Sequence, residues 1–526
     1  MGSSHVIYVY DTTMRDGRQA ESVDFSVNDM LLLTKMLDEF GVDYIEGGWP
    51  ASNPKDKTFF EEVRKIELKN AKMCAFGSTR HAKNSVKEDI NVKELLNAQT
   101  PVVTIFGKSW DLHVEKVFNV SLETNLEMIY DTVAYLKDNG REVIYDAEHF
   151  FDGFKDNPDY ALKTLMQVER AGADNISLAD TNGGTLPYEV SEIMKAVKEV
   201  IKTPLGIHAH NDGELGVANS LEAVRSGAIL VQGTINGFGE RCGNANLVSI
   251  IPNLILKMKM RLNRIDLEKL KKLKDLSMFV YDLANLTPNE RQPFVGASAF
   301  AHKGGVHVNA VQKDPRTYEH IQPEAVGNVR RILISEQSGK SNVLSKIKNI
   351  PELSEVASDD KTIKAVLDKI KHLENQGYNF ESADASFELL VRETVGNKDN
   401  FFECISFTVN VLKNGSQFIN DALVKIRVND AIEITADEGD GPVNALDKAL
   451  RKALTKFYPN IEKLMLIDYK VRIINPKEGS AAKIRVLTEF RYDNTTFTTI
   501  GVSENIIDAS FQAISDAFRF FILKNS

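Results

Sequence analysis

Residues 175–212 read NISLADTNGGTLPYEVSEIMKAVKEVIKTPLGIHAHND and contain one complete unit of the pattern that decides the fold. Two short apolar, β-branched runs, 175–179 and 205–209, are typical of buried strands. The segment between them, 187–201, has the apolar spacing of a helix, and Pro187 suits its first turn. A strand, a helix and a second strand in this order predict a parallel α/β unit.

The same unit repeats along residues 1–262. Helical segments such as 29–41 and 121–140 alternate with short apolar runs, which are VIYVY (6–10), VDYIE (42–46), KMCAF (72–76), VVTIF (102–106), EVIYD (142–146), NISLA (175–179), LGIHA (205–209) and ILVQG (229–233). Eight strands alternating with helices favour a closed (β/α)8 TIM barrel over the alternative, an open Rossmann-type sheet.

The helix boundaries follow from residue types at the ends of these segments. Gly41 is expected to end the first helix, and Ser121 and Gly140 to begin and end the helix of 121–140. Within the first helix, the apolar stripe is expected to consist of Leu32, Lys35, Met36 and Leu37.

The pattern changes after residue 262, which predicts further domains. Residues 263–400 are expected to form helical linker subdomains that cover the active site; they include the Gly- and His-bearing stretch 294–310 and end in a linker at 395–400. Residues 401–526 are expected to form a separate α+β regulatory and dimerisation domain. Its strands are expected at 403–412, 422–429 and 469–475, and its helices at 444–458 and 507–522.

Composition excludes several classes of protein. The chain has 526 residues, 43% hydrophobic and 26% charged, as in an ordinary globular protein, and its net charge of −10 argues against nucleic-acid binding. No apolar run is long enough to span a membrane, and the first residues do not resemble a signal peptide. The three cysteines form no CxxC pair, so we expect a reducing, cytoplasmic location.

Polar clusters follow five of the expected strands, where a barrel carries its active site. They are DTTMRDG (11–17), DAEHFFDG (146–153), ADTNGG (179–184), HAHND (208–212) and NGFGERCGN (236–244). Such a concentration of polar residues on one rim predicts an enzyme. The glycines of 237–243 do not have the spacing or the position of a dinucleotide-binding loop.

His208 and His210 are two residues apart on a strand, so both rings project to one face. An isolated pair of this kind is more often structural, but Asp16 is expected on the same rim and would complete a set of metal ligands. Asn244 could add a carbonyl oxygen. Nitrogen and oxygen donors without thiolate suit Mn²⁺, Mg²⁺ or Zn²⁺.

Other residues of the rim are candidates for substrate contact. Arg15 could stabilise negative charge on a substrate oxygen, or form a surface ion pair. Glu148 could bind substrate or orient a base, or be structural, and Thr181 could hold a carboxylate or cap a turn. His302 and His307, in the Gly-rich loop, are candidate proton carriers.

Several of these motifs are similar to those of a known family. DTTMRDGRQ, HAHND and NGFGERCGN resemble the DRE-TIM metallolyase superfamily, and within it the group of 2-isopropylmalate, homocitrate and citramalate synthases. YIEGGWPASNPKD, FAHKGGVHVNA and NFESADASFELLVR resemble the (R)-citramalate synthase subgroup, and 438–450 and 501–513 its C-terminal regulatory domain. One departure is Met14, where the family usually has leucine.

The resemblance implies a Claisen-type condensation of acetyl-CoA with pyruvate, followed by thioester hydrolysis to (R)-citramalate and CoA, in isoleucine biosynthesis. It implies a divalent metal held by Asp16, His208, His210 and Asn244. It also implies that Arg15 polarises the ketone, that Glu148 and Thr181 bind substrate, and that catalytic groups come from His307, His302 and Tyr318. The family further implies a homodimer, with the 294–310 region completing the partner's active site.

Three alternatives remain open. The first is the same reaction on a larger 2-oxo acid, as in 2-isopropylmalate or homocitrate synthase, because selection among alkyl groups depends on pocket size. The second is a lyase resembling hydroxymethylglutaryl-CoA lyase, and the third is a catalytically inactive amino-acid sensor. The C-terminal domain argues against the second, and intact Arg15, Asp16, His208 and His210 argue against the third.

Feedback control by an amino acid is the expected task of residues 401–526. Two Gly-containing loops, Gly439–Pro442 and the one at Gly501, are each expected to precede a helix. Backbone N–H groups at a helix start can bind a carboxylate. Isoleucine is the expected inhibitor, with leucine as the alternative.

Overall fold

The computed structural model describes two compact units, each considered separately below. Unit 1 comprises Met1–Phe300 and His320–Arg330, and unit 2 comprises Ala301–Glu319 and Arg331–Ser526. The residues described are 6–333, 340–348, 350, 352–353, 359–396, 401–415, 417–474, 482–493 and 495–525. The domain limits expected at 262 and 400 stay predictions.

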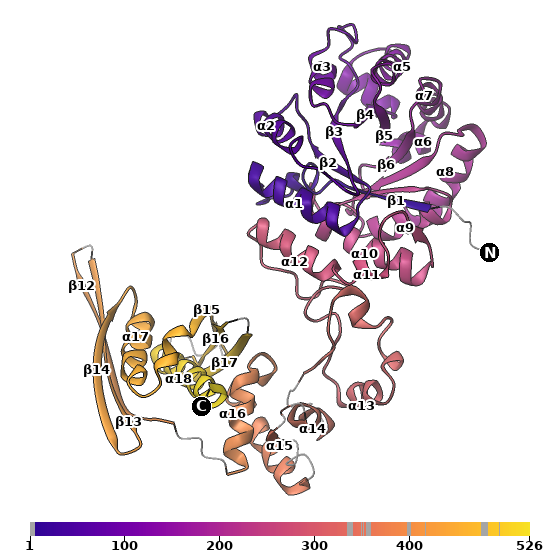
Figure 1. The fold of residues 1–526 in the computed structure, drawn as a ribbon. Helices are drawn as coiled ribbons and strands as arrows, with labels where there is room; N and C mark the ends of the chain where they lie inside the picture. The colour runs from indigo at the N-terminus through magenta and orange to yellow at the C-terminus, as the bar shows by residue number, and fades with distance from the viewer. Residues whose placement is uncertain are drawn as a thin grey trace. The chain divides into compact units, whose positions relative to one another are not determined.

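Unit 1 contains a closed barrel of eight parallel strands (Figure 1). Each strand pairs with the next in chain order, and β1 pairs with both β2 and β8, which closes the ring. The barrel prediction is therefore confirmed and the open sheet excluded. The strands are β1 (Val6–Asp11), β2 (Tyr44–Gly48), β3 (Lys72–Ser78), β4 (Val102–Lys108), β5 (Glu142–Glu148), β6 (Asn175–Asp180), β7 (Leu205–Ala209) and β8 (Leu230–Gly233).

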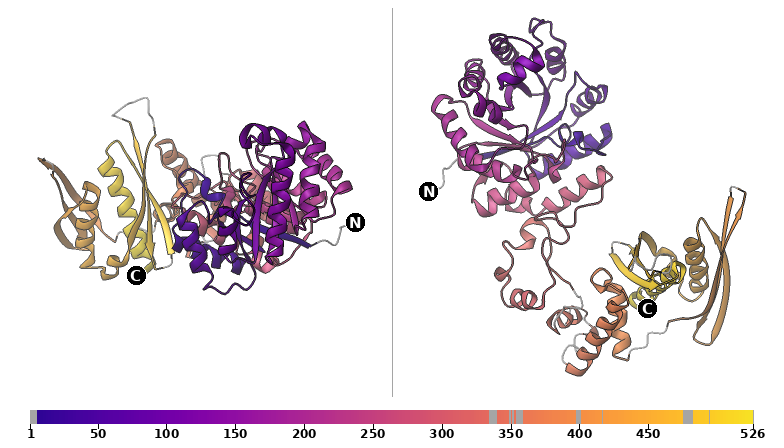
Figure 2. Two further views of the ribbon diagram at one scale, coloured as in Figure 1. Left: turned by 90° about the horizontal axis from the view of Figure 1, so that it is seen from above. Right: turned by 180° about the vertical axis from the view of Figure 1, so that it is seen from behind.

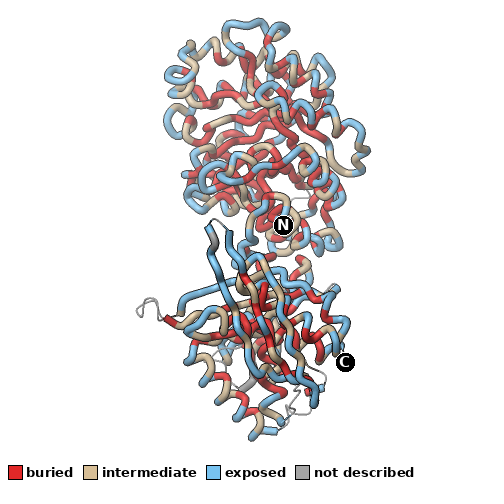
Figure 3. Tube along the Cα trace, turned by 90° about the vertical axis from the view of Figure 1, so that its left-hand side faces the viewer, coloured by how far each residue is buried: buried red, intermediate tan, exposed pale blue. Residues whose placement is uncertain are grey.

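Helices surround these strands (Figure 2). They are α1 (Val27–Phe40), α2 (Pro54–Val63), α3 (Ile90–Asn97), α4 (Asp111–His113), α5 (Leu122–Asp138), α6 (Phe150–Asp156), α7 (Pro158–Arg170), α8 (Pro187–Val200), α9 (Gly216–Arg225) and α10 (Leu247–Pro252). Burial is concentrated along the strands and the inward sides of the helices (Figure 3). The barrel is therefore a packed core, and its polar rim is free to carry a site.

The observed ends of α1 agree with the sequence-based prediction, but its observed buried face does not. Ser26 caps the helix in a capping box with Asp29, and Gly41 ends it with a left-handed φ of 99°. The buried side is formed by Met30, Leu33, Thr34 and Leu37, whereas Leu32 is 41% exposed. The stripe predicted through Leu32 and Lys35 was therefore wrong, because α1 packs on the barrel by the neighbouring face.

A short strand and two helices extend unit 1 beyond the eight repeats. Strand β9 (Arg261–Leu262) pairs in parallel with β1, and α11 (Leu267–Leu270) and α12 (Leu273–Leu283) follow it. Leu270, Leu273, Leu276 and Val280 join the barrel's apolar core. The Lys- and Leu-rich segment after 262 therefore packs against the barrel.

Unit 2 begins with short elements and a helical region. Its strands β10 (Ala301–His302) and β11 (Arg331–Ile332) pair in parallel. Its helices are α13 (Gly305–Lys313), α14 (Lys340–Lys348), α15 (Asp360–Asn375) and α16 (Asp384–Thr394). The predicted linker at 395–400 lies mostly outside the described residues.

The C-terminal part of unit 2 contains two βββα modules of the same order. The first has strands β12 (Glu403–Asn414), β13 (Gln417–Val428) and β14 (Ala431–Gly439), followed by α17 (Pro442–Thr455). The second has β15 (Met465–Ile473), β16 (Ile484–Tyr492) and β17 (Thr495–Ser503), followed by α18 (Ile506–Asn525). All pairings are antiparallel, as expected for an α+β domain.

Gly439 and Gly501 occupy corresponding places in these modules, but neither lies in a loop. Gly439 is the last residue of β14 and Gly501 is within β17. A Cβ at Gly439 would lie 2.4 Å from Ala445 N, and one at Gly501 would lie 2.0 Å from Ala509 O. Each glycine therefore lets a helix approach its strand closely, and the loop expected at Gly501 was wrong.

In the described part of the chain, no helix is long and apolar enough to cross a membrane.

Candidate active site

The turn after β1 carries two site residues and is fixed by its own backbone. Thr12 O accepts hydrogen bonds from the backbone N–H groups of Arg15, Asp16 and Gly17 at 2.9–3.2 Å. The N–H and hydroxyl of Thr13 donate to the fully buried carboxylate of Asp11. The chain therefore reverses tightly at the strand end and presents Arg15 and Asp16 to the barrel mouth.

This turn makes a pH-dependent stability prediction. Burial raises the pKa of Asp11 to about 7, although the Thr13 hydrogen bonds oppose it. Because the folded pKa exceeds the unfolded one, this contribution to stability is complete below pH 4 and is lost as the pH rises to 7. We expect Asp11→Asn to reduce the loss in unfolding free energy between pH 5 and pH 8 by about 1–4 kcal/mol. Urea unfolding measures it, with the exposed Asp282→Asn as control; parallel pH profiles of wild type and Asp11→Asn would contradict it.

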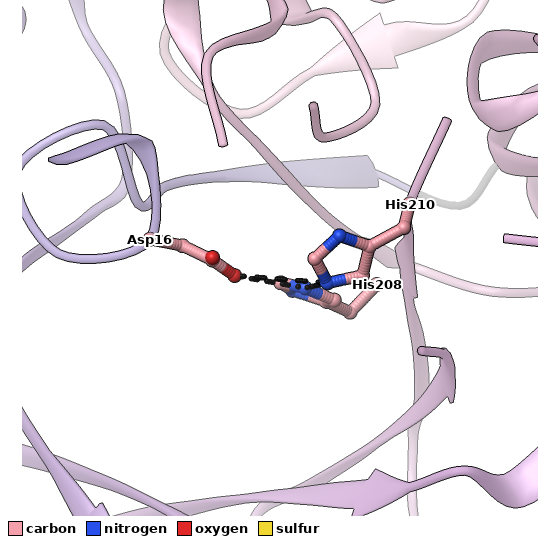
Figure 4. A group of neighbouring side chains, drawn as sticks. All are labelled: Asp16, His208 and His210. Carbon is pink, nitrogen blue, oxygen red and sulfur yellow. Dashed lines mark hydrogen bonds and ion pairs between the residues drawn. The ribbon is translucent and has the colours of Figure 1, made fainter. Parts of the chain in front are cut away.

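Asp16, His208 and His210 form a group that could hold a metal ion. One ligand atom from each lies within 4.8 Å of the others. Asp16 Oδ2 is 3.3 Å from His208 Nε2 and 3.9 Å from His210 Nε2, and the two Nε2 atoms are 3.4 Å apart. Figure 4 shows the carboxylate directed at both rings. All three side chains are buried, so their convergence is set by the fold.

The pKa shifts of Asp16 and His210 suit metal binding, whereas the pKa of His208 is raised, because the neighbouring Asp16 carboxylate outweighs the effect of burial. Burial lowers the pKa of His210 to about 4, so its ring is neutral at neutral pH. Burial alone would raise the pKa of Asp16, but the charges of Arg15 and His208 bring that pKa well below its usual range. A neutral imidazole and an ionised carboxylate are the forms that bind a divalent cation.

A chain of buried polar groups orients His208. Its Nδ1 lies 2.8 Å from Gln232 Oε1, which leaves Nε2 facing Asp16. Gln232 Nε2 donates in turn to Asp146 Oδ1 at 2.7 Å and to Ser177 Oγ at 3.0 Å. Such outer contacts fix the tautomer and the orientation of a metal-binding histidine.

Asn244 supplies an observation independent of the three-residue group. It forms an isolated β-bridge with His210, and its side chain donates to Phe238 O at 3.3 Å. Among the residues that the structure describes, none forms a hydrogen bond with its buried Oδ1 atom. An unsatisfied buried carbonyl beside a ligand strand fits a fourth, weaker metal contact.

Arg15 is held against the cavity wall by two neighbours. Its Nε donates to Glu46 Oε1 at 2.5 Å, and its guanidinium lies 3.7 Å over the ring of Phe76. Glu46 is fully buried in the middle of β2 and also accepts hydrogen bonds from the hydroxyls of Tyr10 and Thr12. The guanidinium also lies 3.3 Å from Asp16 Oδ2, which places a cation beside the candidate metal site.

One cavity of about 220 Å³ at the barrel mouth is lined by Arg15, Asp16, His208 and His210. Glu148 and Thr181 line it too, as do Asp146 and Arg241. Glu148 pairs with Lys108, and Thr181 Oγ1 accepts the backbone N–H of His149 at 2.8 Å. The structure thus brings together Arg15, Asp16, Glu148, Thr181, His208 and His210, while their roles stay proposals.

The remaining candidates lie in unit 2. His302 Nε2 is 3.1 Å from Glu319 Oε1, and its side chain is only 10% exposed. His307 is exposed, and its ring stacks on Tyr318 with centroids 4.2 Å apart. His307 and Tyr318 are therefore presented together at a surface, whereas His302 is held by a hydrogen bond with the buried Glu319.

Sequence reasoning missed Glu46 and Gln232, which orient Arg15 and His208. Each lies on a strand with its side chain buried. The sequence signal for these two residues was a polar side chain within an otherwise apolar strand run: Gln232 in ILVQG and Glu46 in VDYIE. Such a residue costs free energy unless it has partners, so it indicates a buried polar network.

Comparison with known proteins gives matches along the whole chain. Residues 6–277 match the HMGL-like family model, 294–378 the homocitrate synthase post-HMGL domain-like model, and 381–522 the LeuA allosteric (dimerisation) domain. An (R)-citramalate synthase from Geobacter sulfurreducens is 53% identical over 99% of this chain and 98% of its own. One from Aquifex aeolicus is 52% identical over the same shares. The chain belongs to the (R)-citramalate synthase family.

Other proteins show lower similarity. A 2-isopropylmalate synthase from Methanocaldococcus jannaschii is 30% identical over 98% of this chain and 95% of its own. Among solved structures, a hydroxymethylglutaryl-CoA lyase from Pseudomonas aeruginosa has a TM-score of 0.47 and 17% identity, covering 55% of this chain and 96% of that one. Similarity to the (R)-citramalate synthase family is therefore much higher than to the 2-isopropylmalate synthases.

Proposed function

We propose that the protein condenses acetyl-CoA with pyruvate and hydrolyses the thioester product to (R)-citramalate and CoA. The observation that carries this proposal is the convergence of Arg15, Asp16, His208 and His210 on one small cavity in a chain of this family. Asp16, His208, His210 and Asn244 would hold a divalent cation, of which Mn²⁺, Mg²⁺ and Zn²⁺ all suit the donors. Such a cation supplies Lewis-acid polarisation of a substrate carbonyl.

The protein's own side chains would perform the remaining tasks. The Arg15 guanidinium donates hydrogen bonds to the ketone oxygen and stabilises the negative charge that develops there. Thr181 and the backbone around it bind the carboxylate of the 2-oxo acid. Glu148 contacts the substrate on the side opposite Thr181. His307 removes a proton from the acetyl methyl group, and Tyr318 assists the later hydrolysis. The pairing of His302 with Glu319 favours a supporting role for His302.

A panel of 2-oxo acids tests the function. Release of CoA, followed with a thiol reagent, is expected to be fastest with pyruvate and to yield citramalate. Faster release with 2-oxoisovalerate or 2-oxoglutarate would instead support 2-isopropylmalate or homocitrate synthase activity. CoA thioester cleavage without condensation of a 2-oxo acid would support neither.

The apolar outer face of the β12–β14 sheet supports a homodimer. The inner face, with Ala422, Val424 and Ile426, is buried with α17. On the opposite face, the large apolar side chains are 41–58% exposed and are Leu412, Ile419, Leu423, Ile432 and Ile434. Exposed apolar surface of this kind is typical of a subunit interface, as expected in a chain that matches a dimerisation domain.

Complementation tests whether each active site uses both copies. Mixing Asp16→Ala with His307→Ala subunits is expected to restore about a quarter of wild-type activity, because half of the random dimers carry one intact site. The mixture of Asp16→Ala with His208→Ala is the control, since both lesions affect the same barrel rim and no hybrid site is intact. Absence of recovery after confirmed subunit exchange would place His307 in the same copy's site.

Isoleucine is the proposed feedback inhibitor. The match of 381–522 to an allosteric domain supports regulation by an amino acid. Isoleucine is expected to weaken binding of acetyl-CoA or pyruvate by about 5- to 150-fold, and leucine less. The measurement is the KM of each substrate with and without the amino acid. Competition by isoleucine at the barrel cavity alone would contradict an effector site in unit 2.

This test requires the full chain. Phe387, Leu390 and Val391 of α16 share an apolar core with Ile500 and Val502 of β17. Deleting residues 401–526 would expose that core, so loss of inhibition in the truncated chain would not identify the site. The cytoplasmic location expected from the cysteines stays a prediction.

A further inference from the structure

The cavity at the barrel mouth has one apolar wall, formed by three aromatic rings. Phe76 and Phe106 lie near the ends of β3 and β4, and Trp49 directly follows β2, the neighbouring strand in Figure 1. Ring centroids are 5.9 Å apart for Trp49 and Phe76, 5.6 Å for Trp49 and Phe106, and 5.5 Å for Phe76 and Phe106. Apart from Ala179, the other described residues lining the cavity carry charged or polar side chains.

This division of the cavity indicates where the alkyl group of a 2-oxo acid lies. The polar side chains are placed to bind its carboxylate and keto oxygens, so the carbon substituent must face the aromatic rings. One face of Phe76 is already covered by the Arg15 guanidinium at 3.7 Å. Trp49 and Phe106 therefore provide most of the apolar surface that remains.

Trp49 is held in place by hydrogen bonds from both its ring and its backbone. Its indole Nε1 donates to Asn91 Oδ1 at 2.8 Å, and its backbone N–H donates to Asp56 Oδ2 at 2.8 Å. Asn91 Nδ2 is bound to Ser78 O at 2.7 Å, and Asp56 pairs with Arg18 at 2.5 Å. A ring held at both its backbone and its edge resists displacement by a larger ligand.

A β-bulge directly before Trp49 directs its side chain into the cavity. The register between β2 and β3 shifts from Glu46 to Gly48, so that Gly47 is an extra residue. Gly48 has a φ of 138°, and a Cβ there would lie 2.4 Å from Asp56 Oδ2. Gly48 thus permits the close contact with Asp56 that fixes Trp49, whereas Gly47 leaves room for the ring of Phe59, 2.5 Å from where its Cβ would lie.

We infer that Trp49, anchored by Asn91, sets the upper size of the 2-oxo acid's alkyl group and makes the enzyme selective for a methyl substituent. This inference rests on the proposed placement of the 2-oxo acid in the cavity. An extra methylene against a fixed apolar wall changes selectivity by about 10- to 200-fold. The indole ring would impose that limit by exclusion, and removing it would open the space.

The test measures kcat/KM for pyruvate and 2-oxobutyrate with acetyl-CoA, and for acetyl-CoA and propionyl-CoA with pyruvate. In Trp49→Ala, the ratio of 2-oxobutyrate to pyruvate is expected to rise at least about tenfold, with the propionyl-CoA ratio unchanged. Trp49→Phe keeps a ring and is expected to shift the ratio less, and Asn91→Leu removes only the anchor and is expected to shift it in the same direction. Trp110, the other tryptophan of the chain, does not line the cavity, and Trp110→Ala is the matched control.

Two outcomes would overturn the inference. One is an unchanged 2-oxo acid ratio in folded Trp49→Ala, and the other is a gain for propionyl-CoA instead, which would place the wall against the acyl donor. Fluorescence separates this failure from that of the proposed function. In Trp110→Phe, Trp49 is the only tryptophan, and pyruvate with a divalent metal is expected to change its emission. Without that change, pyruvate does not bind beside Trp49, which would overturn the inference; the proposed function is overturned only if the wild-type protein releases no CoA with pyruvate.

Discussion

Replacing His208 by alanine is expected to abolish condensation activity and most divalent metal binding. His208 lies 3.3 Å from Asp16 and 3.4 Å from His210, so its loss leaves two of the three grouped ligands in an open, wet site. Lewis-acid catalysis contributes several kcal/mol, and the expected fall in kcat is therefore about 10³-fold or more. Metal content and calorimetric titration with Mn²⁺ alone measure binding, and CoA release measures activity.

Two further variants sharpen this experiment. Gln232→Leu keeps all ligands but removes the partner of His208 Nδ1, and is expected to weaken metal affinity by about 10–100-fold. His372→Ala changes an exposed histidine of unit 2 and is expected to leave both readouts unchanged. Full activity of the wild type after exhaustive chelation would rule out the metal requirement. Unchanged Mn²⁺ affinity in His208→Ala would remove His208 from the ligand set.

The second large effect is expected for Arg15→Lys, which keeps the charge but loses the planar group. The guanidinium is positioned by Glu46 through Nε and by the ring of Phe76 beneath it. The single nitrogen of an ammonium cannot occupy both the Nε position beside Glu46 and the terminal position that would face a substrate oxygen. If Arg15 stabilises charge that develops in the transition state, kcat should fall by about 10²–10³-fold with a small change in the KM for pyruvate.

Steady-state kinetics with pyruvate and acetyl-CoA distinguish this role from simple binding. Glu46→Gln keeps the shape of the positioning group and should give a smaller loss of kcat than Arg15→Lys. Arg225→Lys is the matched control, because Arg225 forms an exposed ion pair with Glu222 on α9. A wild-type kcat with a raised KM for pyruvate in Arg15→Lys would identify Arg15 as a binding residue only.

Local patterns predicted the barrel because strand and helix periodicity are properties of short segments. The eight strand runs, the caps at Ser121 and Gly41, and the helix start at Pro187 all depend on residues a few positions apart. His208 and His210 share a face for the same reason, since alternate residues of a strand project to one side. The rule that barrel sites lie at strand ends then brought Asp16 to them.

Other features could not be read from neighbouring residues. The buried face of α1 was misjudged because several apolar stripes fit the same segment, and packing on the barrel selected the one with Met30, Leu33 and Leu37. Gly501 was assigned to a loop because glycine favours turns. In the structure it lies within β17, where the backbone of α18 leaves no room for a Cβ.

The sequence by itself therefore determined the barrel, the order of its elements and the residues of the candidate metal group. Only the tertiary structure decided which groups orient the site residues. Glu46, 31 residues away in the sequence, orients Arg15, and Gln232, 24 residues away, orients His208. It also decided that Trp49, Phe76 and Phe106 form one wall, because neighbouring strands bring together side chains from separate βα units. Periodicity fixes the direction of a side chain within its own element, whereas contacts across the barrel depend on register, closure and bulges that no single segment specifies.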